Sequence, residues 1–292
     1  MQVELVQVTT SDGFRLDGAY RESSGSSKCE IDAAIMLHGV GGNFYRSHLF
    51  DVITKGCDAA GIHVARINTR GHDSLTIGHT AMGGRNIGAA LEIVGDCVYD
   101  IAAWCDFLKS RGCTRIALVG HSLGAIKAVY QQAHAPLDSI AAIVAVSPPK
   151  LSGTAFQSAS FAGDYRQEIQ RARALVGEHM GAEMMAITVP FRMFMSAQTY
   201  ADKYGSEKYN ITEFADRLPC PALFVYGSKE LVNGVTFQGL PERLAELKRD
   251  DQHLDVTTVE GADHNYRERE EFLVAEIVKW FENNFTPQNL DF

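Results

Sequence analysis

Six short apolar runs, separated by helical patterns, constrain the fold of this chain more than any other feature. The runs are Ala33–Leu37, His63–Ile67, Ile116–Val119, Ala141–Val146, Ala222–Tyr226 and Val256–Val259. Most of them lack polar alternation, as expected for strands of a parallel sheet that is covered on both faces. Helical patterns lie between and after the runs, at His48–Ala60, Gly88–Ser110, Leu123–His134, Glu242–Lys248 and Glu268–Asn283. This alternation predicts an α/β fold, with a mostly parallel central sheet and helices on both faces.

Two segments interrupt the alternation. Residues 3–20 alternate in polarity around a turn at Ser11-Asp12-Gly13, which predicts an N-terminal antiparallel hairpin. Residues 148–217 contain no clear strand but five of the eight methionines, and we expect them to form a helical cap. The core domain then comprises residues 1–147 and 218–292. Since methionine fits irregular apolar shapes, the cap either lines an adaptable pocket as a lid or only packs onto the core.

Composition argues against several classes of function. The 292 residues, 46% of them hydrophobic, are enough to bury a sizeable core. A net charge of -9 argues against nucleic acid as a partner, since phosphate binding requires a basic surface. No apolar run approaches the ~18 residues of a membrane-spanning helix, and the first residues lack the pattern of a signal peptide. We therefore expect a cytoplasmic protein without a membrane partner.

The six cysteines fit that compartment. None forms a Cys-x-x-Cys pair, and several lie within helical or apolar patterns. We expect reduced, mostly buried thiols and no metal bound through cysteine.

The pentapeptide Gly120-His121-Ser122-Leu123-Gly124 carries the main chemical signal. An apolar run precedes it, and a helical pattern of small residues follows it. This context is typical of a nucleophile elbow, a sharp strand-to-helix turn that presents a serine hydroxyl to a pocket. The serine is expected in a strained backbone conformation, and Gly120 and Gly124 permit strand and helix to approach closely. We interpret Ser122 as the candidate nucleophile.

A serine hydroxyl needs a base to accept its proton and an acid to orient that base. His264 is the candidate base, because it is the histidine that lies in the loop after the last predicted strand. Glu230 is the candidate acid, three residues after the glycine that closes the Ala222–Tyr226 strand. Asp263 is its main rival, but its position beside His264 makes a good bond to the imidazole ring awkward.

The developing oxyanion needs two backbone N–H donors. The first is the amide of Leu123, directly after the nucleophile and at the start of a helix whose dipole favours negative charge. The second is expected from the glycine-rich loop after the first buried strand, with Val40 as first choice and Gly41 as second. A phosphate-binding loop is the competing interpretation, but the endings that such loops require are absent. We interpret His38 in this loop as a structural support.

The order Ser122, Glu230, His264 is the order of the triad in α/β-hydrolases. With the loop His38-Gly39-Val40-Gly41-Gly42-Asn43 before it, the chain resembles a serine hydrolase of the α/β-hydrolase superfamily over nearly its whole length. The insertion after Val146 lies where that superfamily often carries its cap. The resemblance is specific for fold and mechanism and poor for substrate, and Glu230 stands where aspartate is commoner.

These observations favour cleavage of a carboxylic ester of a small or medium-sized, largely apolar substrate through an acyl-enzyme. An amidase, a thioesterase, a carbon–carbon bond hydrolase or an acyltransferase with the same triad remains open, as does a ligand receptor without turnover. The residues expected to contact the substrate are Gly39, Gly41, His121, Met193 and Phe194. We expect no cofactor and no metal. The expected partner is a small-molecule acyl substrate, and the oligomeric state, a homodimer included, is left open.

Overall fold

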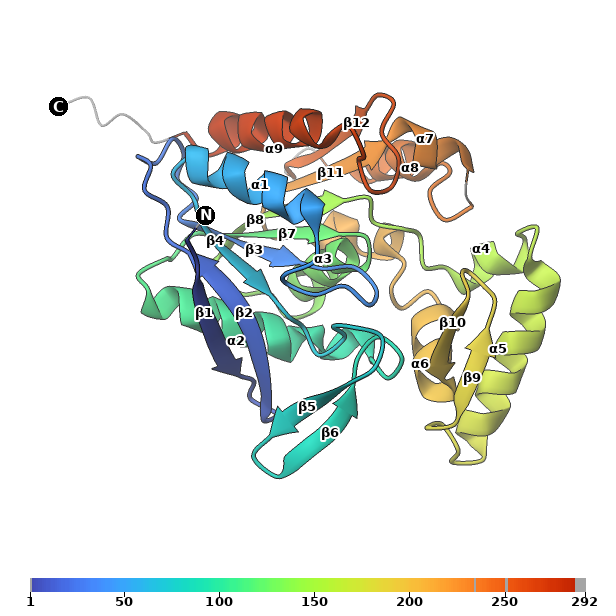
Figure 1. Ribbon diagram of the computed structural model, residues 1–292. Helices are drawn as coiled ribbons and strands as arrows, with labels where there is room; N and C mark the ends of the chain where they lie inside the picture. The colour runs from blue at the N-terminus through green and yellow to red at the C-terminus, as the bar shows by residue number, and fades with distance from the viewer. Residues whose placement is uncertain (1, 234, 250–251, 287–292) are drawn as a thin grey trace.

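One ten-stranded sheet forms the centre of the molecule (Figure 1). The computed structural model describes residues 2–233, 235–249 and 252–286. The strands of the sheet are β1 (Glu4–Thr9), β2 (Phe14–Arg21), β3 (Ala33–Leu37), β4 (His63–Ile67), β5 (Thr76–Thr80), β6 (Gly83–Ile87), β7 (Ile116–His121), β8 (Ile140–Val146), β11 (Ala222–Gly227) and β12 (Leu254–Val259). Their order is β12-β11-β8-β7-β3-β4-β2-β5-β6, and β1 pairs with β2.

The six strands predicted from the apolar runs are confirmed as β3, β4, β7, β8, β11 and β12. Each of them pairs in parallel with its neighbours among the six. The predicted N-terminal hairpin is confirmed as the antiparallel pair β1–β2, which joins the sheet through β4. Because the six strands run the same way, the loops at their carboxyl ends gather at one edge of the sheet.

Helices cover both faces of the sheet. Helices α1 (His48–Ala59) and α9 (Glu270–Asn284) lie side by side on one face, and α2 (Cys97–Ser110) and α3 (Leu123–His134) lie on the other (Figure 1). Two shorter helices, α7 (Ser228–Asn233) and α8 (Leu240–Leu247), follow β11. The fold class predicted from the alternation of strands and helices is therefore confirmed.

Strand β3 illustrates why the runs lack polar alternation. Ala33, Ile35 and Leu37 pack into the hydrophobic core on the α2–α3 side. Ala34 and Met36 pack into the core on the α1–α9 side. Since successive side chains of a strand point to opposite faces, a strand between two helical layers must be apolar at every position.

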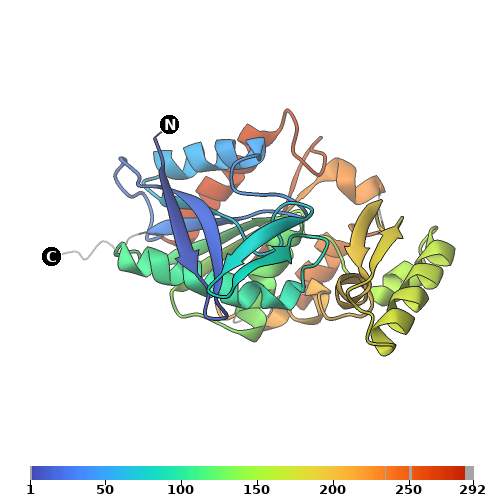
Figure 2. The ribbon, with the colours of Figure 1, turned by 60° about the horizontal axis from the view of Figure 1, so that its bottom comes forward.

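The segment between β8 and β11 forms a separate lobe beside the sheet (Figure 2). Its elements are α4 (Gly153–Gln157), α5 (Ala162–Gly177), β9 (Met184–Ile187), β10 (Met193–Ser196), α6 (Ala197–Tyr204) and the 3-10 turns η2 (Ile211–Glu213) and η3 (Ala215–Arg217). We call residues 148–217 the insertion. Its antiparallel hairpin β9–β10 was not predicted, because strands of four residues are too short for a polarity period to be recognised.

Two further differences from the sequence-based expectation lie near the carboxyl end of β4. Strands β5 and β6 form an antiparallel hairpin whose second strand is mostly exposed, so it lacks the apolar signal of a buried strand. The helix predicted from Gly88 begins later, with the 3-10 turn η1 (Val94–Asp96) and then α2. Gly88 has φ = 116°, which is incompatible with a helix start at that residue.

The cysteines are reduced and mostly buried, as the sequence predicts. All six cysteines are free thiols, and five of them are buried. Among the residues described above, no helix has both the length and the apolar character needed to cross a bilayer.

Helix α3 approaches strands β3 and β7 so closely that only glycine fits at the contact. A Cβ added to Gly124 would lie 1.9 Å from the backbone oxygen of Leu37, and one added to Gly120 would lie 2.2 Å from the backbone oxygen of Gly124. No rotation of a side chain relieves such overlaps, because the atoms that collide belong to the backbone.

We predict that Gly124→Ala lowers the free energy of unfolding by about 3 kcal/mol or more, since the first turn of α3 must move away from β3. Urea unfolding followed by circular dichroism measures the change. Gly163→Ala is the matched control: a Cβ at that position of α5 would meet no atom within 4 Å, so stability should stay within about 1 kcal/mol of wild type. Equal midpoints for the two variants would contradict this account of the contact.

Candidate active site

Ser122 occupies the turn between β7 and α3. Its φ of 56° and ψ of -121° confirm the strained conformation predicted for a nucleophile elbow, at a cost on the order of 1–3 kcal/mol. The serine N–H donates to the backbone oxygen of Val146 at 2.9 Å, which ties the turn to the end of β8. The hydroxyl is thus held at the carboxyl edge of the sheet.

The structure brings Ser122, His264 and Glu230 together from the turn before α3, the loop after β12 and the first turn of α7. His264 Nε2 lies 3.1 Å from Ser122 Oγ, and His264 Nδ1 lies 2.7 Å from Glu230 Oε2. A carboxylate oxygen can only accept, so Nδ1 carries the proton and the lone pair of Nε2 faces the serine hydroxyl. The histidine is therefore oriented to take a proton from Ser122.

Glu230 is buried, with a side chain only 3% exposed, and its second oxygen is also satisfied. Glu230 Oε1 accepts hydrogen bonds from Ser147 Oγ at 2.5 Å and from the Gly227 N–H at 2.8 Å. Ser147 Oγ also lies 3.0 Å from the hydroxyl of Tyr266. These bonds hold the carboxylate in one orientation, so its free oxygen is directed to the imidazole.

The rival acid, Asp263, is engaged elsewhere. Asp263 Oδ1 accepts from the backbone N–H groups of Asn265 at 2.9 Å and Arg267 at 3.1 Å, so it caps its own loop. No hydrogen bond joins it to the His264 ring within the described ranges. This geometry agrees with the choice of Glu230 over Asp263.

His121 supports the loop that carries His264. Its Nε2 lies 2.7 Å from the backbone oxygen of His264, so this nitrogen must be the donor, and the two imidazole rings are 4.9 Å apart. Burial, together with the nearby His264, lowers the pKa of His121 to about 4. Sequence reasoning expected His121 to contact the substrate and did not foresee this bond to the backbone.

The two expected oxyanion donors lie on the same cavity wall as Ser122. In the described part of the chain, neither the Leu123 N–H nor the Val40 N–H has a hydrogen-bond acceptor. Gly39, which precedes Val40, is so close to the serine that an added Cβ would lie 3.1 Å from Ser122 Cβ. Gly41, the second choice for a donor, lines no cavity at Ser122. Two free N–H groups are therefore available beside the hydroxyl.

Two cavities, each of about 370 Å3, share Val40, Ser122, Phe191 and His264 as lining residues. The first is largely apolar and is completed by Leu123, Pro149, Leu151, Phe161, Pro190, Tyr204, Val235, Thr236 and Phe237. The second is more polar and is completed by His38, Gly39, Gly42, Asn43, Arg46, Ser47, Phe50, His121 and Asn265. Ser122 is thus reached by an apolar space under the insertion and by a more polar one beside the Gly39 loop.

The predicted substrate contacts are only partly placed at these cavities. Gly39 and His121 line the polar cavity, whereas Gly41, Met193 and Phe194 line neither. Met193 and Phe194 lie in β10, which pairs with β9, and Phe194 is 68% exposed, so the structure places neither at the cavities beside Ser122. Phe191, in the loop before β10, lines both cavities instead.

Sequence reasoning missed Ser147, Tyr266 and Phe191. Ser147 directly follows the strand β8, so its place at the carboxyl edge was a usable signal. Tyr266 stands two residues after His264, but only the folded loop turns its hydroxyl toward Ser147. Phe191 was one of several aromatic residues in the insertion, and sequence alone did not distinguish it from the others.

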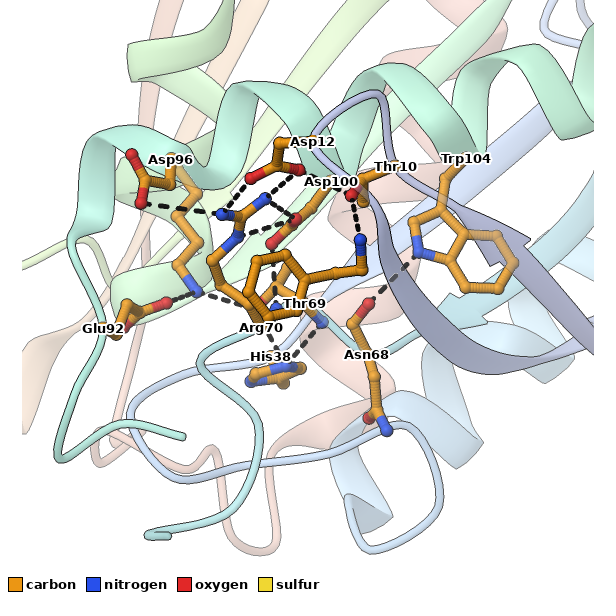
Figure 3. A network of polar contacts seen from close by, with 12 residues as sticks. Thr10, Asp12, His38, Asn68, Thr69, Arg70, Glu92, Asp96, Asp100 and Trp104 are labelled. Atoms are coloured by element: carbon orange, nitrogen blue, oxygen red, sulfur yellow. Dashed lines mark hydrogen bonds and ion pairs between the residues drawn. The ribbon is translucent and has the colours of Figure 1, made fainter. Parts of the chain in front are cut away.

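Ion pairs of Arg70 hold the loop after β4 in place. Arg70 is buried, and its guanidinium donates to Asp12 at 2.7 Å and to Asp100 at 2.8 Å (Figure 3). The Arg70 backbone N–H also donates to Asp100, at 2.8 Å. Because these carboxylates occupy the guanidinium, Arg70 fastens the loop to α2.

Among the described residues, no group of three or more histidine, cysteine or carboxylate side chains could hold a metal ion.

Comparison with known proteins identifies the family of the chain. A family model described as the alpha/beta hydrolase family matches residues 34–276, more than half of the chain. No curated protein matches the chain in sequence.

Solved structures resemble the chain over nearly all of its length. The alpha/beta hydrolase GrgF from Penicillium sp. sh18 has 18% identity and a TM-score of 0.70, with 98% of this chain and 99% of that chain covered. Est1E from Butyrivibrio proteoclasticus, with ferulic acid bound, has 16% identity and a TM-score of 0.66, covering 95% and 98%. The Pyrococcus furiosus esterase PF2001 has 17% identity and a TM-score of 0.62, covering 97% and 91%. At such identities the likeness shows the fold.

The low pKa of His121 predicts a pH-dependent stability. Below its ordinary pKa of 6.5 the unfolded chain binds a proton at this residue, whereas the folded chain does so only near pH 4. The free energy of unfolding should therefore fall as the pH falls from 6.5 to about 4. We expect His121→Gln to reduce this slope, measured by urea unfolding across that range. His79→Gln, which changes an exposed histidine, is the control. A slope unchanged in His121→Gln would contradict the assignment.

Proposed function

Since the chain belongs to the alpha/beta hydrolase family, we propose that it is a serine hydrolase that cleaves a carboxylic ester through an acyl-enzyme. The observation that carries this proposal is the chain of contacts from Ser122 Oγ through both nitrogens of His264 to the buried Glu230. The similar structures named as esterases support an ester as the substrate.

The reaction begins when Ser122 Oγ attacks the acyl carbonyl carbon while its proton passes to His264 Nε2. Glu230 stabilises the imidazolium that forms, because its negative oxygen lies 2.7 Å from Nδ1. The carbonyl oxygen becomes an oxyanion and accepts hydrogen bonds from the N–H groups of Leu123 and Val40. Each such donor contributes about 10²- to 10³-fold in rate in comparable enzymes.

The tetrahedral intermediate then collapses. The bond to the alcohol breaks, the alcohol takes the proton from His264, and an acyl-Ser122 ester remains. A water molecule next gives a proton to His264 and attacks the acyl carbon. The second intermediate releases the carboxylic acid, and Ser122 regains its proton.

The cavities support a largely apolar substrate of small or medium size. Leu151, Phe161 and Pro190 of the insertion face the apolar cavity, whose volume of about 370 Å3 suits an acyl group better than a polymer. In this proposal the insertion, residues 148–217, acts as a cap domain that shields the acyl group from water.

Replacing the nucleophile tests the proposal directly. We predict that Ser122→Ala lowers kcat on a small activated ester, such as a p-nitrophenyl butyrate, by about 10⁴-fold or more. The same variant should lose labelling by a fluorophosphonate probe. Ser110→Ala, which removes an exposed hydroxyl at the end of α2, should leave both readouts unchanged. Turnover that survives in Ser122→Ala would refute the proposed function.

A second pair of variants tests the acid. Glu230→Gln keeps the shape of the side chain but removes the charge that stabilises the imidazolium, so kcat should fall by about 10³- to 10⁴-fold. Asp263→Asn should change kcat less than tenfold, because the Asp263 carboxylate accepts from backbone N–H groups of its own loop and, among the described residues, from no side chain. Steady-state kinetics on the same ester measures both. The opposite ranking would assign the role to Asp263.

A further inference from the structure

The Val40 N–H can serve as an oxyanion donor only if the Gly39–Val40 peptide is held in one orientation. This peptide is planar, and its C=O and N–H point in opposite directions. Whatever holds the Gly39 oxygen therefore also aims the Val40 N–H. The loop contains three glycines, so its backbone does not secure this orientation by itself.

Two donors hold the Gly39 oxygen. His38 Nδ1 lies 2.9 Å from it, and the Gly42 N–H donates to it at 3.1 Å. Because a carbonyl oxygen only accepts, the proton of the neutral His38 ring is on Nδ1, and Nε2 is left as an acceptor. Burial, and next the charge of Lys127, lower the pKa of His38 to about 3, so the ring stays neutral at ordinary pH.

The acceptor nitrogen of His38 is satisfied by Thr69. The Thr69 N–H donates to His38 Nε2 at 3.2 Å, and the Thr69 hydroxyl lies 3.2 Å from the same nitrogen (Figure 3). Lys127 Nζ in turn donates to Thr69 Oγ1 at 2.8 Å. Because Nε2 carries no proton, the hydroxyl can only donate to it, and the single lone pair of Nε2 is shared between the Thr69 hydroxyl and the Thr69 N–H.

Lys127 lies in α3, four residues after Leu123, so it is on the same helix face one turn later. The helix that presents the Leu123 N–H at its start therefore also carries the group that ends this chain of hydrogen bonds. Helix α3 therefore carries the Leu123 N–H itself and is joined to the Gly39–Val40 peptide by this chain of hydrogen bonds.

A buried carboxylate fixes Lys127. Glu92 forms an ion pair with Lys127 and a second one, at 3.3 Å, with Lys203 of α6 in the insertion. All three side chains are at most 2% exposed. Burial alone would raise the pKa of Glu92, but the two lysines, Lys127 first, lower it to about 2, so the carboxylate is charged. An unpaired charge at this depth would be strongly destabilising, so Glu92 keeps Lys127 in place.

We propose that Lys127, Thr69 and His38 are positioning residues that aim the Val40 N–H at the oxyanion by holding the Gly39 carbonyl. This inference rests on the proposed hydrolase function and assigns a role to groups that lie outside the triad. The chain runs from Lys127 Nζ through Thr69 Oγ1 and both ring nitrogens of His38 to the Gly39 oxygen.

Thr69 offers the sharpest test, because Val has its shape without the hydroxyl and Ser keeps the hydroxyl without the methyl. We expect Thr69→Val to lower kcat on the p-nitrophenyl ester about tenfold with KM within twofold, since the oxyanion exists only in the transition state. The inhibition constant of a trifluoromethyl ketone, which forms a tetrahedral oxyanion on serine, should rise about tenfold as well. Thr69→Ser should restore both values to within about twofold of wild type.

A purely structural role for Thr69 gives a different pattern. If Thr69→Val unfolds at lower urea but keeps the wild-type kcat and inhibition constant, the proposal is overturned. It is also overturned if Thr69→Ser loses as much kcat as Thr69→Val, because packing would then explain both losses.

Lys127→Met and Lys203→Met form a second matched pair, since each removes one lysine from the same buried carboxylate. We expect Lys127→Met to lower kcat about as much as Thr69→Val, and the double variant to lose little more, because both changes break one chain. Lys203→Met should lower kcat less than Lys127→Met. Equal losses in the two lysine variants would overturn the proposal.

The kinetics of Ser122→Ala and Thr69→Val distinguish a failure of the proposed function from a failure of the positioning chain. Turnover that persists in Ser122→Ala refutes the hydrolase mechanism. Wild-type kcat in Thr69→Val, with activity lost in Ser122→Ala, refutes the positioning chain alone.

Discussion

The close packing of α3 against β3 and β7 is the constraint on which the rest of the molecule depends. Gly124 lets the first turn of α3 approach the backbone oxygen of Leu37, and Gly120 lets β7 pass beside that turn. Ser122 is thereby forced to φ = 56° at the edge of the sheet. Because the loop that begins at His38 leaves β3 at the same place, the contact brings the Leu123 and Val40 N–H groups beside one serine oxygen.

Buried charge gives the loops around this contact their fixed orientation. Glu230 has three hydrogen-bond partners: His264 on one oxygen, and Ser147 and the Gly227 N–H on the other. Glu92 is held in the same way between Lys127 and Lys203. A buried carboxylate that loses its partners is strongly destabilised, so these groups favour a single arrangement of the loops that they join.

The insertion contributes in two places. Its residues Leu151, Phe161 and Pro190 line the apolar cavity at Ser122, and its Lys203 reaches Glu92 in the core. Part of the lining of the apolar cavity and one partner of the buried carboxylate therefore come from the same segment.

The sequence by itself determined the layered architecture and the candidates for the chemistry. Apolar runs such as Ala33–Leu37 report burial on both faces directly, and the glycines around Ser122 report a backbone contact. The tertiary structure alone decided which side chains meet. Ser147 contacts Glu230 and the Tyr266 hydroxyl from a different loop, Phe191 rather than Met193 or Phe194 lines the cavity, and the hairpin β9–β10 is too short to recognise. The physical reason is that local patterns record how a segment is buried, whereas a contact between distant segments depends on loop conformations that no local pattern encodes.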